Sequence, residues 1–262
     1  MHDSLPAAIR QVVAGAPLLP DTIGESPCRV HAFRRGRERF FLKICPAVHA
    51  ATTYSVRREA RVLDWLAGKL SVAEVVAVAE HEGEGEGEEF MVTRAVPGVP
   101  LSARLRAGLP VTGLFREALR QLQAVPVSDC PFDSGAAMRL RELDYLLARD
   151  LIDPDHDLSQ WPGLDTPQAL LAHLQAHLPD EDPVFSHGDL CDSNVFVDAH
   201  DRLHFIDLGR GGVADRWLDV AFAHRNLRED VGDEAARALL ATIGVPDRPD
   251  RRRFFEQLDE LF

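Results

Sequence analysis

The sequence predicts an α+β protein built in two parts, a small antiparallel sheet followed by a mostly helical region. The first observation is that residues 1–95 hold short runs of β-branched and aromatic residues that alternate with polar turns. The second is that apolar residues recur at helical spacing from residue 98 onward. The third is a short hairpin pattern at 195–206, set among these helices. We therefore expect two lobes, 1–95 and 96–262.

The patterning of each lobe predicts its elements. In the first lobe, strands are expected at 29–33 and 40–44, joined by a basic turn, and at 72–79 and 90–93, with a helix over 53–69 between the two pairs. In the second lobe, helices are expected at 101–124, 139–150, 167–178 and 234–243. A short strand at 183–186 precedes the hairpin formed by 195–197 and 203–206. The Gly/Glu alternation at 82–89 is typical of a solvated loop and has no context of a dinucleotide motif.

Bulk composition disfavours several classes of protein. No stretch approaches the roughly 18–20 uninterrupted apolar residues of a membrane span, and the start of the chain lacks the pattern of a signal peptide. The four cysteines show no metal-binding spacing, so we expect reduced thiols in the cytoplasm. A net charge of −13 disfavours nucleic acid and anionic membranes and favours cationic ligands, although solubility alone explains it equally well. We expect a monomer or a weak dimer.

The most informative segment is His-Gly-Asp-Leu-Cys-Asp-Ser-Asn at residues 187–194, with Asp207 thirteen residues after Asn194. Kinase-type phosphoryl transfer needs a carboxylate at the attacking hydroxyl and hard oxygen ligands for the Mg²⁺ that accompanies ATP. Asp189 stands where a kinase catalytic loop keeps that carboxylate, and Asn194 and Asp207 can supply the metal-binding oxygens. Either half alone is consistent with a polar turn or a strand-end carboxylate. The loop before the hairpin at 195–206 carries Asp189 and Asn194, and the loop after it carries Asp207. We therefore expect all three residues at the same end of the hairpin.

A second group of residues is suited to holding a triphosphate. Lys43 lies within an apolar strand, where an ammonium needs a carboxylate or phosphate partner, and Glu59 on the following helix is the candidate carboxylate. Such a pair holds the α- and β-phosphates in kinases. Without the motif at 187–207, a Lys43 that reaches solvent and a solvated Glu59 would be the preferred interpretation. The small loop with Gly24 and Ser26 can offer backbone N–H groups and a hydroxyl to the phosphates.

The base of the nucleotide requires a backbone donor, a backbone acceptor and an apolar surface on which to stack. Thr93 and Ala95, at the end of the last predicted strand of the first lobe, can offer the backbone groups, and Phe41 can offer an aromatic face. Phe41 is equally consistent with an ordinary core residue.

Taken together, these residues resemble the aminoglycoside phosphotransferase family. The likeness is carried by residues 184–194, by residues 205–219 and by the ending 258–262, which is similar to that of members acting on a 3′-hydroxyl, whereas streptomycin kinases typically end differently. It extends over nearly the whole chain. The resemblance implies a protein-kinase-like bilobal fold and resistance through ATP- or GTP-dependent phosphorylation of the 3′-hydroxyl of antibiotics such as kanamycin and neomycin, with Mg²⁺ as cofactor.

The resemblance also implies roles for individual residues. Asp189 would be catalytic and Asn194 and Asp207 would hold magnesium, while the nucleotide would be bound by Ser26, Phe41, Lys43, Glu59, Thr93, Ala95 and Ile206. The aminoglycoside would be bound by Asp157, Arg210, Arg225, Glu229, Asp230, Asp259, Glu260 and Phe262 with its terminal carboxylate. Physical chemistry supports an acidic site, because each carboxylate that meets an amine of this polycation gives a charge-assisted hydrogen bond of about 1.5–3 kcal/mol. A solvated charge run at a helix end is the alternative for Glu229 and Asp230.

One segment departs from the family pattern. Asp157, Leu158 and Gln160 stand where close relatives carry Glu, Asn and Glu, in the acidic loop expected over the substrate. Fewer charges in this loop predict a narrower range of aminoglycosides than the broadest relatives accept.

Two other functions remain as alternatives. A kinase of the same fold could act on another small hydroxylated substrate, such as streptomycin, a macrolide or a metabolic amino alcohol, although the acidic ending disfavours a macrolide, which has few amines. A catalytically silent module that binds nucleotide or sequesters antibiotic is disfavoured because Asp189, Asn194, Asp207 and Lys43 are all present.

Overall fold

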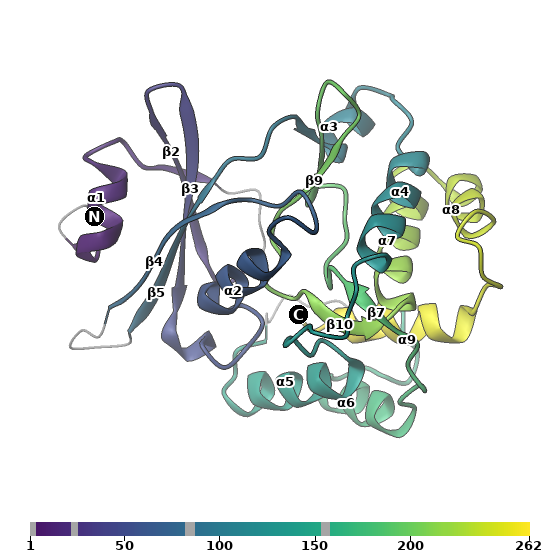
Figure 1. The fold of residues 1–262 in the computed structure, drawn as a ribbon. Helices are drawn as coiled ribbons and strands as arrows, with labels where there is room; N and C mark the ends of the chain where they lie inside the picture. Colours follow the sequence, from purple (N-terminus) through teal and green to yellow (C-terminus); the bar gives the residue numbers. More distant parts are fainter. Residues whose placement is uncertain (1–3, 22–25, 82–86, 153–157) are drawn as a thin grey trace. The chain divides into compact units, whose positions relative to one another are not determined.

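The computed structural model describes residues 4–21, 26–81, 87–152 and 158–262 (Figure 1). The chain divides into two compact units. The first, which we call the N-unit, comprises Met1–Val99 and Phe196–Arg210, and the second, the C-unit, comprises Pro100–Val195 and Gly211–Phe262. The sequence placed the boundary after residue 95 and the hairpin in the second lobe. In the structure the first unit continues to Val99, and most of the hairpin joins it.

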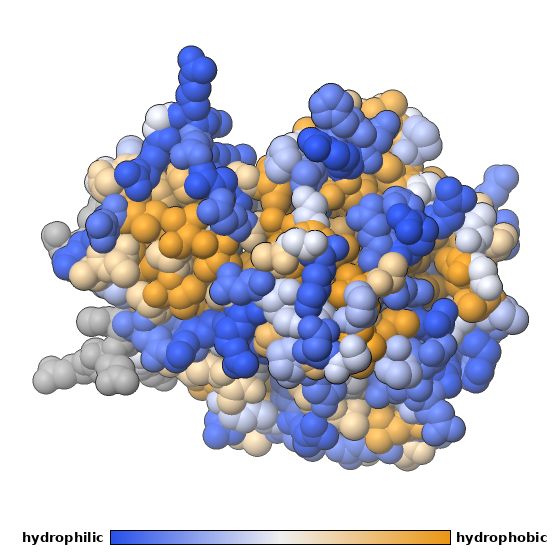
Figure 2. All heavy atoms as spheres, in the orientation of Figure 1, coloured by the Kyte–Doolittle hydropathy of each residue, from blue (hydrophilic) through white to orange (hydrophobic). Residues whose placement is uncertain are grey.

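The N-unit contains a five-stranded antiparallel sheet in the order β1-β2-β3-β5-β4. Its strands are β1 (Leu19–Asp21), β2 (Arg29–Arg35), β3 (Glu38–Pro46), β4 (Val75–His81) and β5 (Glu88–Arg94). The four predicted strands are present, and β1 is an additional edge strand too short to leave a sequence pattern. The basic turn lies at the exposed end of the β2–β3 hairpin, whose tip is hydrophilic in Figure 2.

Two helices pack on the sheet, one on each face. The alternation of side chains along β3 decides which of its residues meets which helix. Helix α1 (Ala7–Val13) was not predicted, and it joins a core cluster that includes Leu42 and Ile44 of β3. Lys43 lies between these two residues and therefore points to the opposite face. There α2 (Val56–Leu66) presents Glu59 to it. The Ser55 hydroxyl caps α2 by accepting the Arg58 N–H at 3.2 Å, which explains why the helix begins later than residue 53.

The C-unit is mostly helical, as the sequence predicted, around a two-stranded antiparallel sheet of β7 (Pro183–Ser186) and β10 (Gly212–Asp215). Its helices are α3 (Leu101–Arg106), α4 (Thr112–Gln123), α5 (Ala136–Ala148), α6 (Pro167–Ala176), α7 (Trp217–Asp230), α8 (Asp233–Leu240) and α9 (Pro249–Asp259). The single helix expected over 101–124 is two, because the chain leaves helical geometry after α3 at Gly108, where φ is +69°. Within the described residues, no helix is both long enough and apolar enough to cross a membrane.

Helix α7 was missed because it is buried nearly all round. Its buried residues run without a break from Trp217 to His224 and include the polar side chains of Asp219 and His224. A helix covered on every side shows no amphipathic stripe, which is the feature that sequence patterning detects. Helix α9 was missed for a different reason, since its first turn consists of a proline, an aspartate and arginines.

The hairpin of β8 (Val195–Val197) and β9 (Leu203–Phe205) pairs with β6 (Val99–Pro100) in the order β6-β8-β9. Its attachment to the N-unit has identifiable contacts. The Phe205 N–H donates to the Ser71 carbonyl at 2.9 Å, and the Ser71 hydroxyl bonds to Nδ1 of His204 at 2.7 Å. Gly98 also approaches the backbone of Val197 closely. These hydrogen bonds join segments distant in sequence, so hydrophobic periodicity could not predict them.

The approach of Gly98 to Val197 gives a test of the N-unit. Gly98 has a φ of +92°, and a Cβ at this position would lie 2.6 Å from the Val197 carbonyl carbon. Gly98→Ala should therefore lower the free energy of unfolding by about 2–3 kcal/mol, through left-handed strain and backbone overlap. Gly68→Ala is the matched control, because Gly68 has a φ of +78° with no atom within 4 Å of the added Cβ. It should cost only about 1 kcal/mol. Equal losses for the two variants in urea unfolding would contradict the prediction.

Candidate active site

The loop that carries Asp189 follows β7 in the C-unit and is held through its backbone. Gly188 has a φ of +81°, which turns the chain sharply before Asp189. Asp219 of α7, only 2% exposed, accepts the N–H groups of His187 at 2.7 Å and of Gly188 at 2.9 Å. Burial raises the pKa of Asp219, although His187 and these backbone donors oppose the shift. The first turn of α7 thus supports the predicted catalytic loop, a role that the sequence analysis did not assign to Asp219.

Two further side chains of the C-unit contact this loop. Asn194 donates from Nδ2 to both the backbone oxygen and Oδ2 of Asp189, at 3.0 and 3.1 Å. The structure therefore brings Asp189 and Asn194 together, with the Asn194 oxygen Oδ1 as the atom suited to a metal. Arg139 of α5, which is 1% exposed, donates to the carbonyl of Gly188 at 3.0 Å. Sequence reasoning missed Arg139, because an arginine within a helix gives no signal that it is buried.

The predicted Lys43–Glu59 pair is present in the N-unit, and Asp207 completes it. Lys43 Nζ lies 2.9 Å from Glu59 Oε2 and 2.6 Å from Asp207 Oδ1. Burial by itself would lower the pKa of Lys43, but the charges of Asp207 and Glu59 raise it well above its ordinary value. Burial raises the pKa of Glu59, and the Lys43 ammonium opposes this shift. The cluster therefore contains a firmly charged ammonium and one carboxylate more than that ammonium can neutralise.

The surplus carboxylate belongs to the more exposed partner, which suits it to a cation. The Asp207 side chain is 43% exposed, whereas that of Glu59 is 5% exposed. The segment after Asp207 packs against the start of α2, where Arg58 donates to the Gly209 carbonyl. A Cβ on Gly209 would lie 2.7 Å from the Thr53 carbonyl oxygen, so this packing requires glycine.

Asp207 in the N-unit and Asn194 in the C-unit each carry an oxygen of the type that Mg²⁺ prefers. No group of three His, Cys, Asp or Glu side chains in the described part of the chain could hold a metal ion. Mg²⁺ in nucleotide sites needs only one or two protein oxygens, because phosphates and waters supply the remaining ligands. The exposed carboxylate of Asp207 and the amide oxygen of Asn194 are oxygen donors of this hard type.

The predicted base-binding residues lie on β3, on β5 and just beyond β5. Phe41 of β3 is paired with Thr93 of β5, and the Arg39 guanidinium lies 4.7 Å from the Phe41 ring centre. The Ala95 N–H donates to the Arg39 carbonyl at 2.9 Å. The Ala95 N–H is thus engaged within the protein, because the pairing of β3 with β5 extends to this group. That Thr93 and Ala95 offer backbone groups to a base stays a prediction.

The remaining nucleotide-binding candidates are Ile206, Ser26 and the loop before Ser26. Ile206 is half-buried beside Asp207, and Ser26 is a half-buried residue just before β2. The loop residue Gly24 lies outside the described residues.

Four of the predicted substrate carboxylates lie at the C-terminal ends of α7 and α9, and each of the four contacts another side chain. Asp259 forms an ion pair with Arg225, and its side chain is only 12% exposed. Glu260 accepts a hydrogen bond from Gln160 at 2.8 Å, and Asp230 accepts one from Asn226. Arg225 and Asp259, both assigned to the substrate, therefore bind each other, since the long arginine side chain on α7 reaches α9.

The other predicted substrate residues are more dispersed. The Glu229 side chain is 59% exposed and lies 3.3 Å from Arg228. Arg210 belongs to the N-unit, where it donates to the Tyr54 hydroxyl at 3.1 Å. Asp157 lies outside the described residues.

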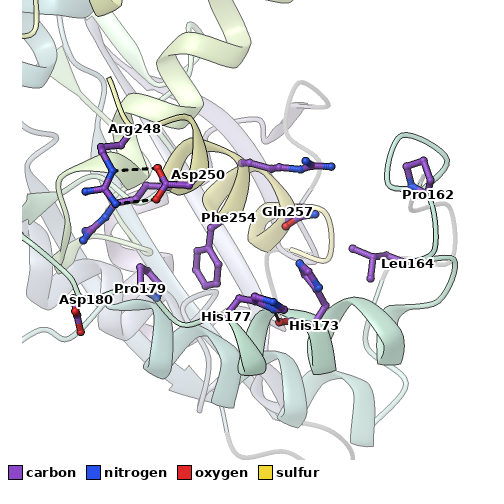
Figure 3. Close-up of a pocket in the computed structure, with 12 residues that line it drawn as sticks. Pro162, Leu164, His173, His177, Pro179, Asp180, Arg248, Asp250, Phe254 and Gln257 are labelled. Atoms are coloured by element: carbon purple, nitrogen blue, oxygen red, sulfur yellow. Dashed lines mark hydrogen bonds and ion pairs between the residues drawn. The ribbon is translucent and has the colours of Figure 1, made fainter. Parts of the chain in front are cut away.

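A cavity of about 710 Å³ in the C-unit lies elsewhere, between α6, α9 and the segment before α6 (Figure 3). None of the sequence-predicted site residues lines it. Arg248 and Asp250 are joined there by two hydrogen bonds, of 3.1 and 2.8 Å, and thereby neutralise each other. Because arginines, histidines and aspartates share the lining, the cavity lacks the acidic character that a polyamine requires.

Comparisons with known proteins identify the family to which this chain belongs. The sequence profile of the Phosphotransferase enzyme family (APH) matches residues 25–255. An aminoglycoside 3′-phosphotransferase of Acinetobacter baumannii is 39% identical over 98% of this chain and 99% of its own. The crystal structure of an aminoglycoside-3′-phosphotransferase of type VIII superposes with a TM-score of 0.80 at 30% identity, over 97% of this chain and 98% of that one.

A more distant likeness bears on the fold alone. The crystal structure of a choline kinase from Streptococcus pneumoniae superposes with a TM-score of 0.63 at 12% identity, over 95% of this chain and 85% of that one. The expected protein-kinase-like fold, an antiparallel sheet followed by helices, is confirmed. From the matched length, the near-complete coverage of its relatives and the shared fold, we conclude that this chain is a member of the phosphotransferase enzyme family.

Proposed function

We propose that the protein transfers the γ-phosphate of ATP or GTP to the 3′-hydroxyl of aminoglycosides such as kanamycin and neomycin, and that it thereby confers resistance. One observation carries the proposal: a chain with a backbone-anchored Asp189 loop matches, over nearly its full length, relatives that are named for this reaction. We further propose that it acts as a monomer or weak dimer in the cytoplasm, the compartment that supplies the nucleotide.

In the proposed reaction, Asp189 acts on the acceptor sugar. Its carboxylate accepts a hydrogen bond from the 3′-hydroxyl, orients the oxygen toward the γ-phosphorus and takes the proton late. Phosphoryl transfer has a loose transition state, so orientation of the oxygen contributes more than removal of the proton. Asn194, which donates to Asp189 Oδ2, restricts the rotation of that carboxylate.

The proposed nucleotide site uses Lys43, held by Glu59, against the phosphates. Asp207 and Asn194 would hold Mg²⁺, which when bound neutralises charge on the phosphates. Lys43 also donates a hydrogen bond to Asp207. A phosphate oxygen that reaches the Lys43 ammonium therefore either replaces the Asp207 carboxylate or binds beside it.

The acidic residues at the ends of α7 and α9 are the proposed contacts for the amines. The Glu229 side chain is 59% exposed, whereas Asp259 is only 12% exposed and is neutralised by Arg225. An ammonium that binds Asp259 must compete with a guanidinium, which reduces its gain in free energy. The proposal therefore assigns Glu229, Asp230 and Glu260 more of the amine recognition than Asp259.

The first test replaces the proposed catalytic carboxylate. Asp189→Ala should lower kcat for kanamycin by at least about 100-fold, because it removes the group that orients the hydroxyl. Nucleotide affinity, measured by calorimetry, should stay near the wild-type value. Asp165→Ala is the control, because Asp165 is an exposed aspartate outside every proposed site. Normal turnover by the Asp189 variant would end the assignment.

The second test uses the fact that the chain has two lysines, Lys43 and Lys69. Lys43→Met should raise the KM for ATP by about tenfold or more, because charged hydrogen bonds to phosphate are lost. Lys69→Met, which removes only an ammonium stacked on Trp65, should not change it. A similar effect of both substitutions in steady-state kinetics would refute the role of Lys43.

The raised pKa of Lys43 predicts a pH dependence. Asp207 and Glu59 raise this pKa well above 10.5, so the ammonium stays charged across the working range. Its contribution to stability is fully present below 10.5, the ordinary lysine value, and is lost as the pH rises through the higher folded value. In pH-dependent urea unfolding, Lys43→Met should cost a constant amount from pH 7 to about 10. If the loss of stability caused by Lys43→Met vanished as the pH rose from 7 to 9, the raised pKa of Lys43 would be contradicted.

The substrate range is tested by ADP release across a panel of antibiotics. Kanamycin and neomycin should be turned over, with slower turnover of butirosin and amikacin, because Leu158 and Gln160 place no charge in the loop that the family resemblance sets over the substrate. Lividomycin, which lacks a 3′-hydroxyl, reports on regiochemistry. Equal turnover of kanamycin, neomycin, butirosin and amikacin would contradict the narrow spectrum, and turnover of streptomycin alone would favour the alternative kinase.

A further inference from the structure

Arg139 of α5 is a fully buried arginine that reaches two functional segments of the C-unit. Its Nη1 donates to the carbonyl of Gly188 at 3.0 Å, directly before Asp189. Its guanidinium carbon lies 4.8 Å from the centre of the Phe262 ring, within the range of a cation–π contact. With an exposed fraction of 1%, it is among the largest fully buried side chains of the described residues. Burying a guanidinium is costly, so these two contacts contribute to keeping it in place.

The contact with Gly188 completes the support of the Asp189 loop. Asp219 accepts the N–H groups of His187 and Gly188, and Arg139 donates to the carbonyl of Gly188. The negative Asp219 therefore holds the N–H donors of this short backbone segment, and the positive Arg139 holds its carbonyl acceptor. Because the Gly188 carbonyl and the Asp189 N–H belong to one planar peptide, fixing this carbonyl also restrains the backbone from which the Asp189 side chain extends.

The contact with Phe262 holds the other segment. Phe262 lies three residues beyond the end of α9, and its N–H donates to the carbonyl of Asp259 at 3.2 Å. A ring fixed under the Arg139 guanidinium therefore restrains the turn that carries Asp259 and Glu260. These are two of the carboxylates proposed to meet the aminoglycoside.

We propose that Arg139 is a positioning residue that couples the proposed aminoglycoside-binding turn at 259–262 to the Asp189 loop. This inference rests on the proposed function and names a residue of the same site. Through its hydrogen bond Arg139 orients Asp189, and through its stacked face it orders the acidic turn. Lysine at this position can reproduce the hydrogen bond but not the planar stacking, so the two contributions are separable.

The experiment is a double-mutant cycle between Arg139→Lys and Phe262→Leu. Phe262→Leu keeps an apolar side chain and removes the aromatic ring that the guanidinium contacts. Each single variant should raise the KM for kanamycin by about tenfold, the change expected when a desolvated cation–π contact is lost. The KM for ATP should stay within about twofold, because neither residue is assigned to the nucleotide. The double variant should be no worse than either single variant, since both remove the same contact.

The matched control is Arg141→Lys on the same helix. The Arg141 side chain is 68% exposed and lies 3.8 Å from Asp133, so this substitution should leave the kinetics unchanged. Arg139→Met should additionally lower kcat, because it removes the hydrogen bond to the Gly188 carbonyl. Thermal unfolding of each variant identifies the temperature at which all are folded and comparable. If Arg139→Lys fails to fold, Phe262→Leu alone decides, because it leaves the Gly188 bond intact.

The outcomes distinguish the coupling from the proposed function. Three outcomes overturn the coupling while wild-type turnover stands. The effects of Arg139→Lys and Phe262→Leu on the kanamycin KM could be additive, or the KM for ATP could rise as much as that for kanamycin. The third such outcome is an unchanged kanamycin KM in Phe262→Leu. A wild-type protein that releases no ADP with any aminoglycoside overturns the proposed function and the coupling with it. Non-additive effects confined to the aminoglycoside support the coupling.

Discussion

The backbone of the Asp189 loop contains polar groups that are buried, and buried N–H and C=O groups must be paired if the loop is to keep one conformation. Asp219 accepts two of the N–H groups, and Arg139 donates to the carbonyl between them and Asp189. Both partners are themselves nearly inaccessible, so neither can exchange its bond for water at low cost. The loop, the start of α7 and the first turn of α5 are consequently held as one arrangement. The position of Asp189, on which the proposed chemistry depends, follows from these bonds.

The N-unit solves a comparable problem with a buried charge. Lys43 lies on a strand whose neighbouring residues build the hydrophobic core, and strand alternation directs it away from that core toward α2. Glu59 and Asp207 bind it, and their charges overcome the cost of burial. The arrangement leaves surplus negative charge on the more exposed Asp207. A single cluster thereby offers the Lys43 ammonium to phosphate and the Asp207 carboxylate to a cation.

The extent of sequence-based prediction can be judged from individual residues. Four of the five strands of the N-unit sheet were predicted, and the motif residues Asp189, Asn194 and Asp207 were singled out. Both results rest on β-alternation and motif spacing, which are local properties of a sequence. The Lys43–Glu59 pair was also predicted, from the rule that a charge within an apolar strand needs a partner. The pairing of Arg225 with Asp259 and the engagement of the Ala95 N–H were not. Each depends on which side chain or backbone group another element brings within 4 Å, and spacing along the chain does not determine this.

By itself the sequence determined the α+β class, the order of a sheet-forming part and a helical part, and the residue types that the chemistry needs. These follow from periodicity and from the ligands that Mg²⁺ and phosphate prefer. Only the tertiary structure decided that the hairpin joins the N-unit, that Asp219 and Arg139 hold the Asp189 loop, and that most of the candidate substrate carboxylates contact other side chains of the protein. The physical reason is that burial and long-range hydrogen bonding arise when distant segments pack. A buried arginine within a helix has the same local pattern as an exposed one.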